Sequence, residues 1–306
     1  MGQVMVDKKI SFSQYQMWKG CPHRWKLNYI DKLSGTNPSI ALVFGTAMHE
    51  TLQHYVKTIY DSSIKEADSL DLSTMLTDTM RNEYKKLLLE NNEKHFSNSE
   101  EMQEHYLDGL EIIKWIKSKR SELFQKKDHE LLGIEMPINI VPLKSHPSVK
   151  LVGFLDLVIK NNITEKIYIY DFKTSTKGWS SYAKNDKVKI SQLVLYKTYY
   201  AEQYNVSPDD IIVEYLILKR KVDEDAEYAA MKRRVQRFEP SNGKVSQNAI
   251  KKEIEKFIEY NFTNDGEYKL DVVRPAIGGK DNNNCRFCIY NESEEYCPKE
   301  KRQVLF

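Results

Sequence analysis

Two aspartates and a lysine are the residues of this sequence whose types and spacing indicate chemistry. Asp156 lies within the apolar run Gly153–Val158, and Asp171 ends the apolar run that starts at Ile167. Burying a carboxylate is costly unless it is paired or binds a metal. Lys173 follows Asp171 by two residues, so both side chains leave the same face of a strand. Two carboxylates and an ammonium in one pocket are suited to metal-dependent hydrolysis of a phosphodiester.

The role of each group follows from what that reaction needs. A divalent cation, Mg²⁺ or Mn²⁺, neutralises the charge that develops on the phosphate and lowers the pKa of an attacking water. Asp156 and Asp171 are the expected ligands, and the Phe172 carbonyl is a further one. Lys173 is expected to hold the water or to stabilise the phosphate charge. For Asp-x-Lys alone, charged residues at a strand end are the simpler interpretation.

Four other residues are candidates for the same pocket. His49 lies at the edge of an apolar helical stripe, where it is either a satisfied helix-edge histidine or a metal ligand. Gln192 and Tyr196 are four residues apart, so they are neighbours on a helix and can face the metal and the scissile phosphate. Glu135 is the weakest candidate, because a polar strand face explains it equally well.

The elements that must position these residues can be predicted from hydrophobic periodicity. Alternating apolar residues predict three strands, and a turn-like segment at 161–165 makes the second and third a hairpin. A helix between the third strand and a fourth predicts a parallel crossover. The predicted segments are strands at 131–143, 151–160, 166–173 and 211–218 and helices at 40–60, 190–204 and 247–260.

Four regions are expected along the chain. N-terminal helices of the core occupy 1–60, starting with the overlapping capping boxes of residues 11–16, and a helical insertion occupies 61–128. The core with the active site spans 129–262, and a cysteine-containing tail at 263–306 packs on the N-terminus. The predicted fold class is α/β with an α+β character: a mixed sheet of four to five strands flanked by helices.

The composition is that of an ordinary globular protein. Of 306 residues, 41% are hydrophobic and 29% are charged, which excludes general disorder. The net charge of +2 gives no global field that attracts nucleic acid, so DNA affinity must come from local patches. No apolar stretch approaches the roughly 20 residues of a membrane span, and no signal peptide is recognisable. We therefore expect a cytoplasmic location, in a bacterial or phage-infected cell, and no membrane partner.

The ordered motifs resemble those of the PD-(D/E)XK nuclease superfamily and, within it, the RecB-type exonuclease branch. His49 resembles the branch's helix histidine, and Gly153-Phe154-Leu155-Asp156 its first acidic motif, with Leu155 at the position of the proline. Asp171-Phe172-Lys173 resembles the D-x-K motif, and the segment Gln192–Tyr196 resembles the Q-x-x-x-Y helix. The resemblance implies a restriction-endonuclease-like core.

The resemblance also implies an activity and partners. It implies a Mg²⁺- or Mn²⁺-dependent deoxyribonuclease, an exonuclease by preference, that acts on DNA ends or single strands in recombination, repair or phage DNA metabolism. No phosphate-binding loop of an NTPase is present in the sequence, so a helicase or recombination partner must be a separate chain. The alternatives are a DNA-binding or assembly module of a recombination or CRISPR-adaptation complex, and a hydrolase of small phosphate esters.

Four cysteines form a second candidate metal centre. Cys285 and Cys288 form a C-x-x-C pair, Cys297 follows, and Cys21 is alone near the N-terminus. Thiolates at such spacing suit zinc or an iron-sulfur cluster, and plain thiols are the third interpretation. One early and three late cysteines resemble the AddB-like iron-sulfur nucleases, although the last interval is longer here. That resemblance implies a 4Fe-4S cluster, with structural Zn²⁺ as the alternative, that joins the chain ends.

Clusters of basic residues are candidates for contact with a DNA backbone. They comprise Lys184, Lys187 and Lys189 before the 190–204 helix, whose N-terminal amides favour phosphate, and the clusters at 219–221 and 232–234. Solvated faces are the alternative explanation for each of them.

Overall fold

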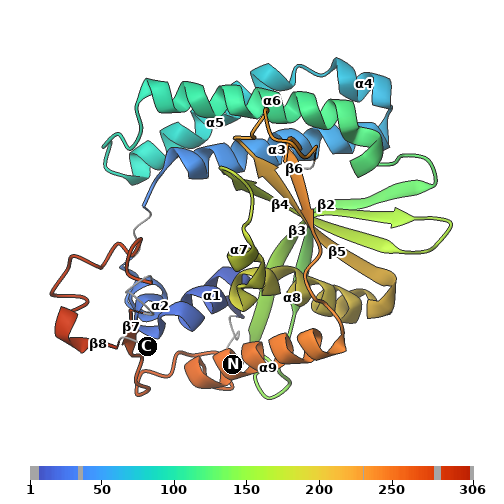
Figure 1. Ribbon diagram of the computed structural model, residues 1–306. Coiled ribbons are helices and arrows are strands. Elements are labelled where there is room, and N and C mark those ends of the chain that lie inside the picture. Colours follow the sequence, from blue (N-terminus) through green and yellow to red (C-terminus); the bar gives the residue numbers. More distant parts are fainter. Residues whose placement is uncertain (1–6, 34–36, 230, 279–283, 304–306) are drawn as a thin grey trace, which may run out of the picture. The chain divides into compact units, whose positions relative to one another are not determined.

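The computed structural model describes residues 7–33, 37–229, 231–278 and 284–303. The chain divides into two compact units, each assembled from separate stretches of sequence. Unit 1 comprises Met1–Asn37, Pro137–Gly153 and Gly243–Phe306, and unit 2 comprises Pro38–Met136 and Phe154–Asn242. Figure 1 labels the elements of both units. No helix of the described residues is long and apolar enough to cross a membrane.

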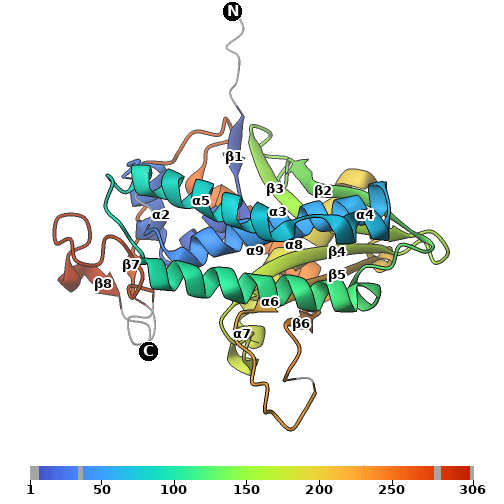
Figure 2. The same cartoon turned by 90° about the horizontal axis from the view of Figure 1, so that it is seen from above.

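Unit 2 contains a layer of helices. Its longest members lie side by side, with α3 beneath α5 and α6 (Figure 1 and Figure 2). Gly109 of α6 allows close helix packing, because an added Cβ would lie 2.7 Å from Leu76 Cδ2. The helices are α3 (Ile40–Asp61), α4 (Ile64–Ser69), α5 (Leu72–Glu90) and α6 (Ser99–Leu123).

The sheet of unit 2 is mixed, as the sequence predicts. β3 and β4 are antiparallel, β4 and β5 are parallel, and β5 and β6 are antiparallel. β2 also pairs with β3. The parallel connection runs through α7, α8 and a short 3₁₀ helix, Pro208–Asp210. The bounds are β2 (His129–Ile140), β3 (Val149–Asn161), β4 (Ile167–Ser175), β5 (Ile211–Lys219), β6 (Val235–Phe238), α7 (Ser181–Asn185) and α8 (Lys187–Tyr204).

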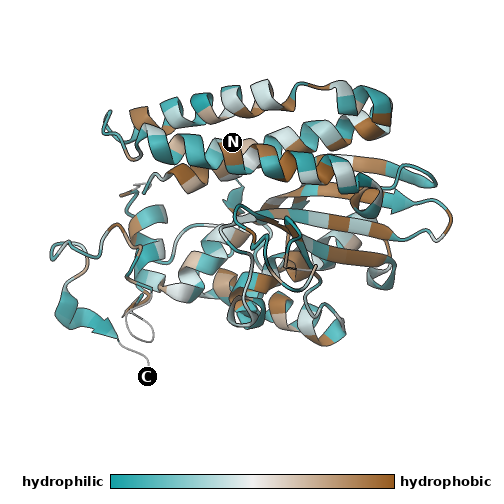
Figure 3. Ribbon diagram, turned by 45° about the horizontal axis from the view of Figure 1, so that its top comes forward, coloured by the Kyte–Doolittle hydropathy of each residue, from teal (hydrophilic) through white to brown (hydrophobic). Residues whose placement is uncertain are grey.

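Helices cover both faces of this sheet. Leu216 and Leu218 of β5 share a buried apolar core with α3, whereas the alternate residue Tyr215 contacts the backbone of α8 through its hydroxyl. Hydrophobic residues run along the strands and along one side of the helices (Figure 3). The predicted fold class, a mixed sheet flanked by helices, is therefore confirmed.

Unit 1 joins the first and last parts of the chain. The short strand β1 (Lys8–Ile10) is parallel to the first residues of β3. Trp25 packs edge-on against Phe257 and Phe262 at ring-centroid distances of 5.5 and 6.0 Å, so aromatic contacts form the core between the early and late helices. The remaining elements are α1 (Phe12–Gly20), α2 (Pro22–Tyr29), α9 (Lys244–Asn261), β7 (Ala276–Ile277), a 3₁₀ helix (Lys299–Lys301) and β8 (Arg302–Gln303).

Candidate active site

Asp156 and Asp171 lie on the neighbouring strands β3 and β4 of unit 2. The antiparallel register pairs Leu157 with Tyr170, so the two aspartates occupy the next position along the pair. The Phe172 N–H donates a hydrogen bond of 2.7 Å to Asp156 Oδ2. The side chain thus bonds to the neighbouring strand where the regular pairing ends, which fixes one carboxylate oxygen and leaves the other for a ligand.

Lys173 and Asp171 share one face of β4. Lys173 Nζ lies 2.7 Å from Asp171 Oδ2, and the lysine side chain keeps 31% of its surface exposed whereas that of Asp171 keeps 3%. Burial lowers the pKa of Lys173, but the charge of Asp171 and its hydrogen bond outweigh that effect and leave the pKa raised. The ammonium is therefore charged at neutral pH and accessible from one side.

His49 approaches the carboxylates from α3. Its Nδ1 lies 3.4 Å from Asp156 Oδ2, and its ring packs edge-on against Phe172 at 5.9 Å. Burial lowers the pKa of His49 to about 4, despite the opposing effect of the Asp171 charge. The imidazole is therefore neutral at pH 7, which is the form that binds metals.

The electrostatics of the two carboxylates are unfavourable without a cation. Burial raises the pKa of Asp156 well above its ordinary value, and the negative charge of Asp171 raises it further. Two carboxylates, a neutral imidazole and a strand carbonyl form a donor set that fits Mg²⁺ or Mn²⁺. Within the described residues, no group of three or more His, Cys, Asp or Glu is already gathered closely enough to hold an ion.

Gln192 and Tyr196 lie on α8 as neighbours. Gln192 Nε2 donates to the Tyr196 hydroxyl at 3.2 Å. Burial raises the pKa of Tyr196, and the charges of Asp171 and Asp156 add to this effect, so the phenol lies within electrostatic range of both carboxylates. The role of both residues at the carboxylates stays a prediction, which the effect of the two charges on Tyr196 supports.

Glu135 belongs to this group more closely than its sequence position indicates. Gln53, one turn after His49 on α3, donates to Glu135 Oε1 at 2.5 Å and to the Asp156 carbonyl at 3.5 Å. The φ of Glu135 is 49°, a left-handed conformation that interrupts the alternation of β2. The Glu135 charge also contributes to raising the pKa of Asp156. Gln53 was missed; the sequence signal is its i+4 spacing from His49.

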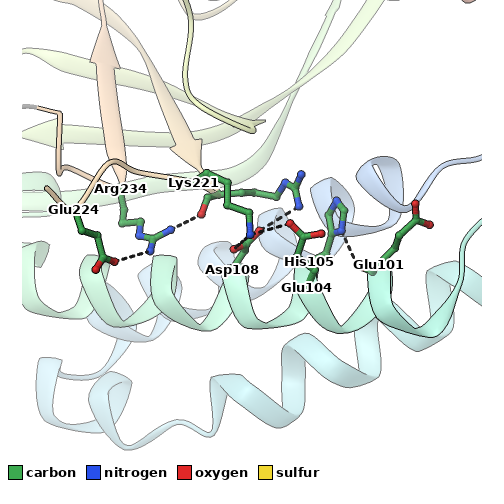
Figure 4. Close-up of polar contacts among 8 residues, drawn as sticks. Glu101, Glu104, His105, Asp108, Lys221, Glu224 and Arg234 are labelled. Carbon is green, nitrogen blue, oxygen red and sulfur yellow. Dashed lines mark hydrogen bonds and ion pairs between the residues drawn. The ribbon is translucent and has the colours of Figure 1, made fainter. Parts of the chain in front are cut away.

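Four of the six basic residues at the ends of the β5–β6 connection, residues 220–234, are engaged in contacts within unit 2. Lys232 and Arg233 are exposed, and their contact with a DNA backbone stays a prediction. Arg220 Nη1 and Lys221 Nζ lie 3.1 and 3.0 Å from the two carboxylate oxygens of the buried Asp108 on α6 (Figure 4). Arg234 donates to the Arg220 carbonyl, and Lys219 Nζ donates to the Met231 carbonyl at 3.0 Å. Arg220 and Lys221 thus hold the β5–β6 connection to α6, and Lys219 and Arg234 bond to carbonyls within that connection.

The N-terminus of α8 is not an open phosphate site either. Asp186 caps this helix, and its Oδ1 accepts hydrogen bonds from the N–H groups of Val188 and Lys189 at 3.0 and 3.1 Å. A carboxylate thus takes the amides that were expected to favour phosphate. Any phosphate contact here must come from side chains.

The four cysteines all line one cavity in unit 1. Cys21 Sγ accepts hydrogen bonds from the Arg24 and Ile277 N–H groups at 3.5 and 3.3 Å. All four are free thiols, and burial raises the pKa of Cys285 and Cys297. Four sulfur donors around one cavity suit a soft metal centre, although within the described residues they are not gathered into a metal-holding group.

Comparison with known families follows from this fold. A mixed sheet flanked by helices, with acidic residues on neighbouring strands, is consistent with a nuclease fold. The chain belongs to the PD-(D/E)XK nuclease superfamily, whose family model matches residues 9–297. The superfamily predicted from the sequence is thereby confirmed, and the RecB-type branch stays a prediction. The comparison with curated proteins gives no match.

Proposed function

We propose that this protein is a Mg²⁺- or Mn²⁺-dependent DNA nuclease of the RecB type that degrades DNA from ends or along single strands. The observation that carries the proposal is the convergence of Asp156, Asp171 and Lys173 on two paired strands beside His49. Superfamily membership supports a phosphodiester substrate. The exonuclease preference and a role in recombination, repair or phage DNA metabolism rest on the resemblance of the motifs.

The chain's own groups divide the work of the reaction. Asp156, Asp171, the Phe172 carbonyl and His49 would hold the divalent ion, and Glu135 adds a further negative charge beside Asp156. When bound, the ion would neutralise phosphate charge and acidify a water. The Lys173 ammonium orients that water or stabilises the charge on the scissile phosphate. Tyr196, held by Gln192, positions the phosphate from the α8 side.

The cysteine cavity supports a second, structural part of the proposal. We infer that Cys21, Cys285, Cys288 and Cys297 hold a 4Fe-4S cluster, with Zn²⁺ as the alternative. Cys21 belongs to the first helices and the others to the C-terminal tail, so the ion or cluster would join the two ends of the chain. A helicase or recombination protein would act as a separate partner chain, and the proposed location is the cytoplasm.

The nuclease is tested with end-labelled linear DNA and closed circular DNA, each in Mg²⁺, in Mn²⁺ and in EDTA. We expect the linear substrate to be trimmed in either metal, the circle to survive, and EDTA to stop the reaction. Asp171→Asn and Lys173→Met should abolish trimming, whereas Asp78→Asn, an exposed aspartate on α5, should not. Equal trimming by Asp171→Asn, Lys173→Met and wild type would remove the proposal.

A further inference from the structure

A rigid cluster of aromatic rings is built around Trp179, which follows the D-x-K strand β4. The Trp179 N–H donates to Gln236 Oε1 at 2.7 Å, and Gln236 Nε2 donates back to the Trp179 carbonyl at 3.2 Å. The buried Trp179 ring packs against Tyr215 and Phe238 at 4.9 and 6.1 Å. Trp179, Tyr215 and Phe238 are called the aromatic platform below. Backbone clamping and ring packing together fix its orientation.

Two lysines lie over the rings of this platform. Lys189 Nζ is 4.3 Å from the centroid of Trp179, and Lys184 Nζ is 5.5 Å from that of Phe238. Neither ammonium has a carboxylate within ion-pair distance in the part of the chain that the structure describes. Asp186, which lies between them in sequence, uses Oδ1 to cap α8. A ring face attracts an ammonium without accepting its N–H groups as a carboxylate does, so the donors remain available.

The platform is also close to the residues proposed for chemistry. Tyr215 is the parallel register partner of Asp171, and its hydroxyl donates to the Lys189 and Ile190 carbonyls. Burial lowers the pKa of Lys189, Asp186 opposes this effect, and the positive charge of Lys173 contributes to the lowering. The Lys189 ammonium is thus sensitive to the charge of Lys173, and an anion that binds Lys189 reduces the repulsion between the two cations.

We propose that Lys189 and Lys184, held on the aromatic platform, bind the DNA phosphate next to the scissile one. This inference rests on the proposed nuclease function and assigns the substrate path to the α7–α8 side of the site. The ligand is the phosphodiester of a strand, recognised by charge and without base contacts. The rings keep each ammonium in place before substrate binds, so little side-chain freedom is lost on binding.

The test compares Lys189→Gln with Lys187→Gln. Lys187 is an exposed lysine of the same helical turn that contacts no ring in the described structure, so it controls for charge alone. On an end-labelled single-stranded oligonucleotide we expect Lys189→Gln to raise KM roughly tenfold and to reduce the salt slope of binding by about 1. The kcat should stay within about twofold, because the proposal places Lys189 on the neighbouring phosphate and not on the scissile one.

Further variants separate the outcomes. Lys189→Arg should restore most of the affinity, because guanidinium also lies over aromatic rings. If Lys189→Gln does not fold, Lys184→Gln tests the same phosphate contact through the lysine that lies over Phe238. Equal effects of Lys187→Gln and Lys189→Gln, or no effect of either lysine on the platform, would overturn the inference.

The experiments distinguish failure of the proposed phosphate contact at Lys189 and Lys184 from failure of the proposed nuclease function. Wild-type protein that does not cleave DNA in Mg²⁺ or Mn²⁺ contradicts the proposed function. Wild-type protein that cleaves with the same KM as Lys189→Gln contradicts only the proposed phosphate contact. Fluorescence anisotropy of the labelled oligonucleotide in Ca²⁺ measures the salt slope in either case.

Discussion

Two clusters of metal-binding residue types differ in how the chain holds them. Asp156, Asp171 and His49 lie on β3, β4 and the long helix α3, and a hydrogen bond from the Phe172 backbone fixes Asp156. The cysteines line a cavity formed by the start of α2, turns and two-residue strands. Regular elements hold the carboxylates without an ion, whereas Cys285, Cys288 and Cys297 lie on turns and irregular segments outside the long helices and strands.

Because of this difference, we expect the carboxylate cluster to determine mainly the reaction rate and the cysteine cluster mainly the stability of the fold. Carboxylates forced together on a rigid scaffold destabilise the metal-free protein and await a cation, so their loss should affect rate more than stability. Thiols on irregular segments would gain order from the proposed metal, so their loss should affect stability more than rate. Variants at each cluster should therefore give opposite results in activity and melting assays.

The largest effect is expected for Asp156→Asn. The carboxamide removes a ligand charge, so kcat should fall roughly 10³-fold. The pKa of Asp156 is raised in the folded protein, so its ionisation costs stability as the pH rises above the ordinary value of 3.8. The metal-free variant should therefore melt roughly 2–4 °C higher than wild type at pH 7, measured by differential scanning fluorimetry with EDTA.

The control for this variant is the response to metal. Mg²⁺ should raise the melting temperature of the wild type and leave that of Asp156→Asn unchanged. A variant that melts lower than wild type in EDTA would show that Asp156 stabilises the fold, and the contrast between the two clusters would be lost.

The next effect concerns the cysteine cavity. A protein with Cys285→Ser and Cys288→Ser should lose its bound iron or zinc and about 3–4 kcal/mol of stability, which lowers its melting temperature by roughly 10 °C. Its kcat well below that temperature should stay near the wild-type value. Metal analysis, visible absorbance and thermal melting measure the change.

Phe287→Ser is the matched variant, because Phe287 lies between the two cysteines with 69% of its surface exposed. It should keep both metal and melting temperature. If the double cysteine variant and wild type melt together and neither contains metal, the cavity is a packing feature.

A smaller effect is expected at Asp108, a carboxylate with cationic partners and no proposed part in chemistry. Asp108→Asn leaves Arg220 and Lys221 without their shared anion, which should cost about 2 kcal/mol of stability. Urea unfolding measures this loss of stability. Glu104→Gln removes an exposed partner of Lys221 and should change little. A drop in kcat beyond about threefold for Asp108→Asn would link the β5–β6 connection to catalysis.

The smallest effect is expected at Glu135. Glu135→Gln keeps the shape that Gln53 contacts but removes a charge beside Asp156, so half-maximal activity should need roughly tenfold more Mg²⁺. High Mg²⁺ should restore kcat. Glu130→Gln, an exposed glutamate on the same strand, is the control. An unchanged Mg²⁺ requirement would show that Glu135 belongs to a polar strand face and takes no part in metal binding.

Local sequence patterns predicted the elements that carry the carboxylates. The other features depend on contacts between residues far apart in the sequence, which local patterns do not show. The β3–β4 hairpin and the crossover helix are rich in apolar residues and are bounded by polar turn-like segments, so their places could be read from the sequence. The strands β1 and β6 have three and four residues, too few for a periodic signal. α8 begins at Lys187, three residues before the predicted start, because Asp186 caps it.

The role of individual charges was harder to predict than their position. Asp108 and Arg220 are 112 residues apart, and no local pattern shows that they pair. Glu135 was assigned to a polar strand face because strict alternation was assumed, and its φ of 49° breaks that alternation. Such positions depend on the assembled fold, and functional residues concentrate there.

The parallel pairing of β4 with β5 sets an order in which the site can form during synthesis. Asp171 and Lys173 are synthesised before α8 and β5, and β4 gains its complete parallel neighbour only once residue 219 has been made. Long-range pairing of this kind forms late in folding. A nascent chain that has just completed its acidic motif therefore still lacks α8, which carries Gln192 and Tyr196, and the strand β5 that pairs with β4. The proposed cleavage activity would therefore appear late in the synthesis of the chain.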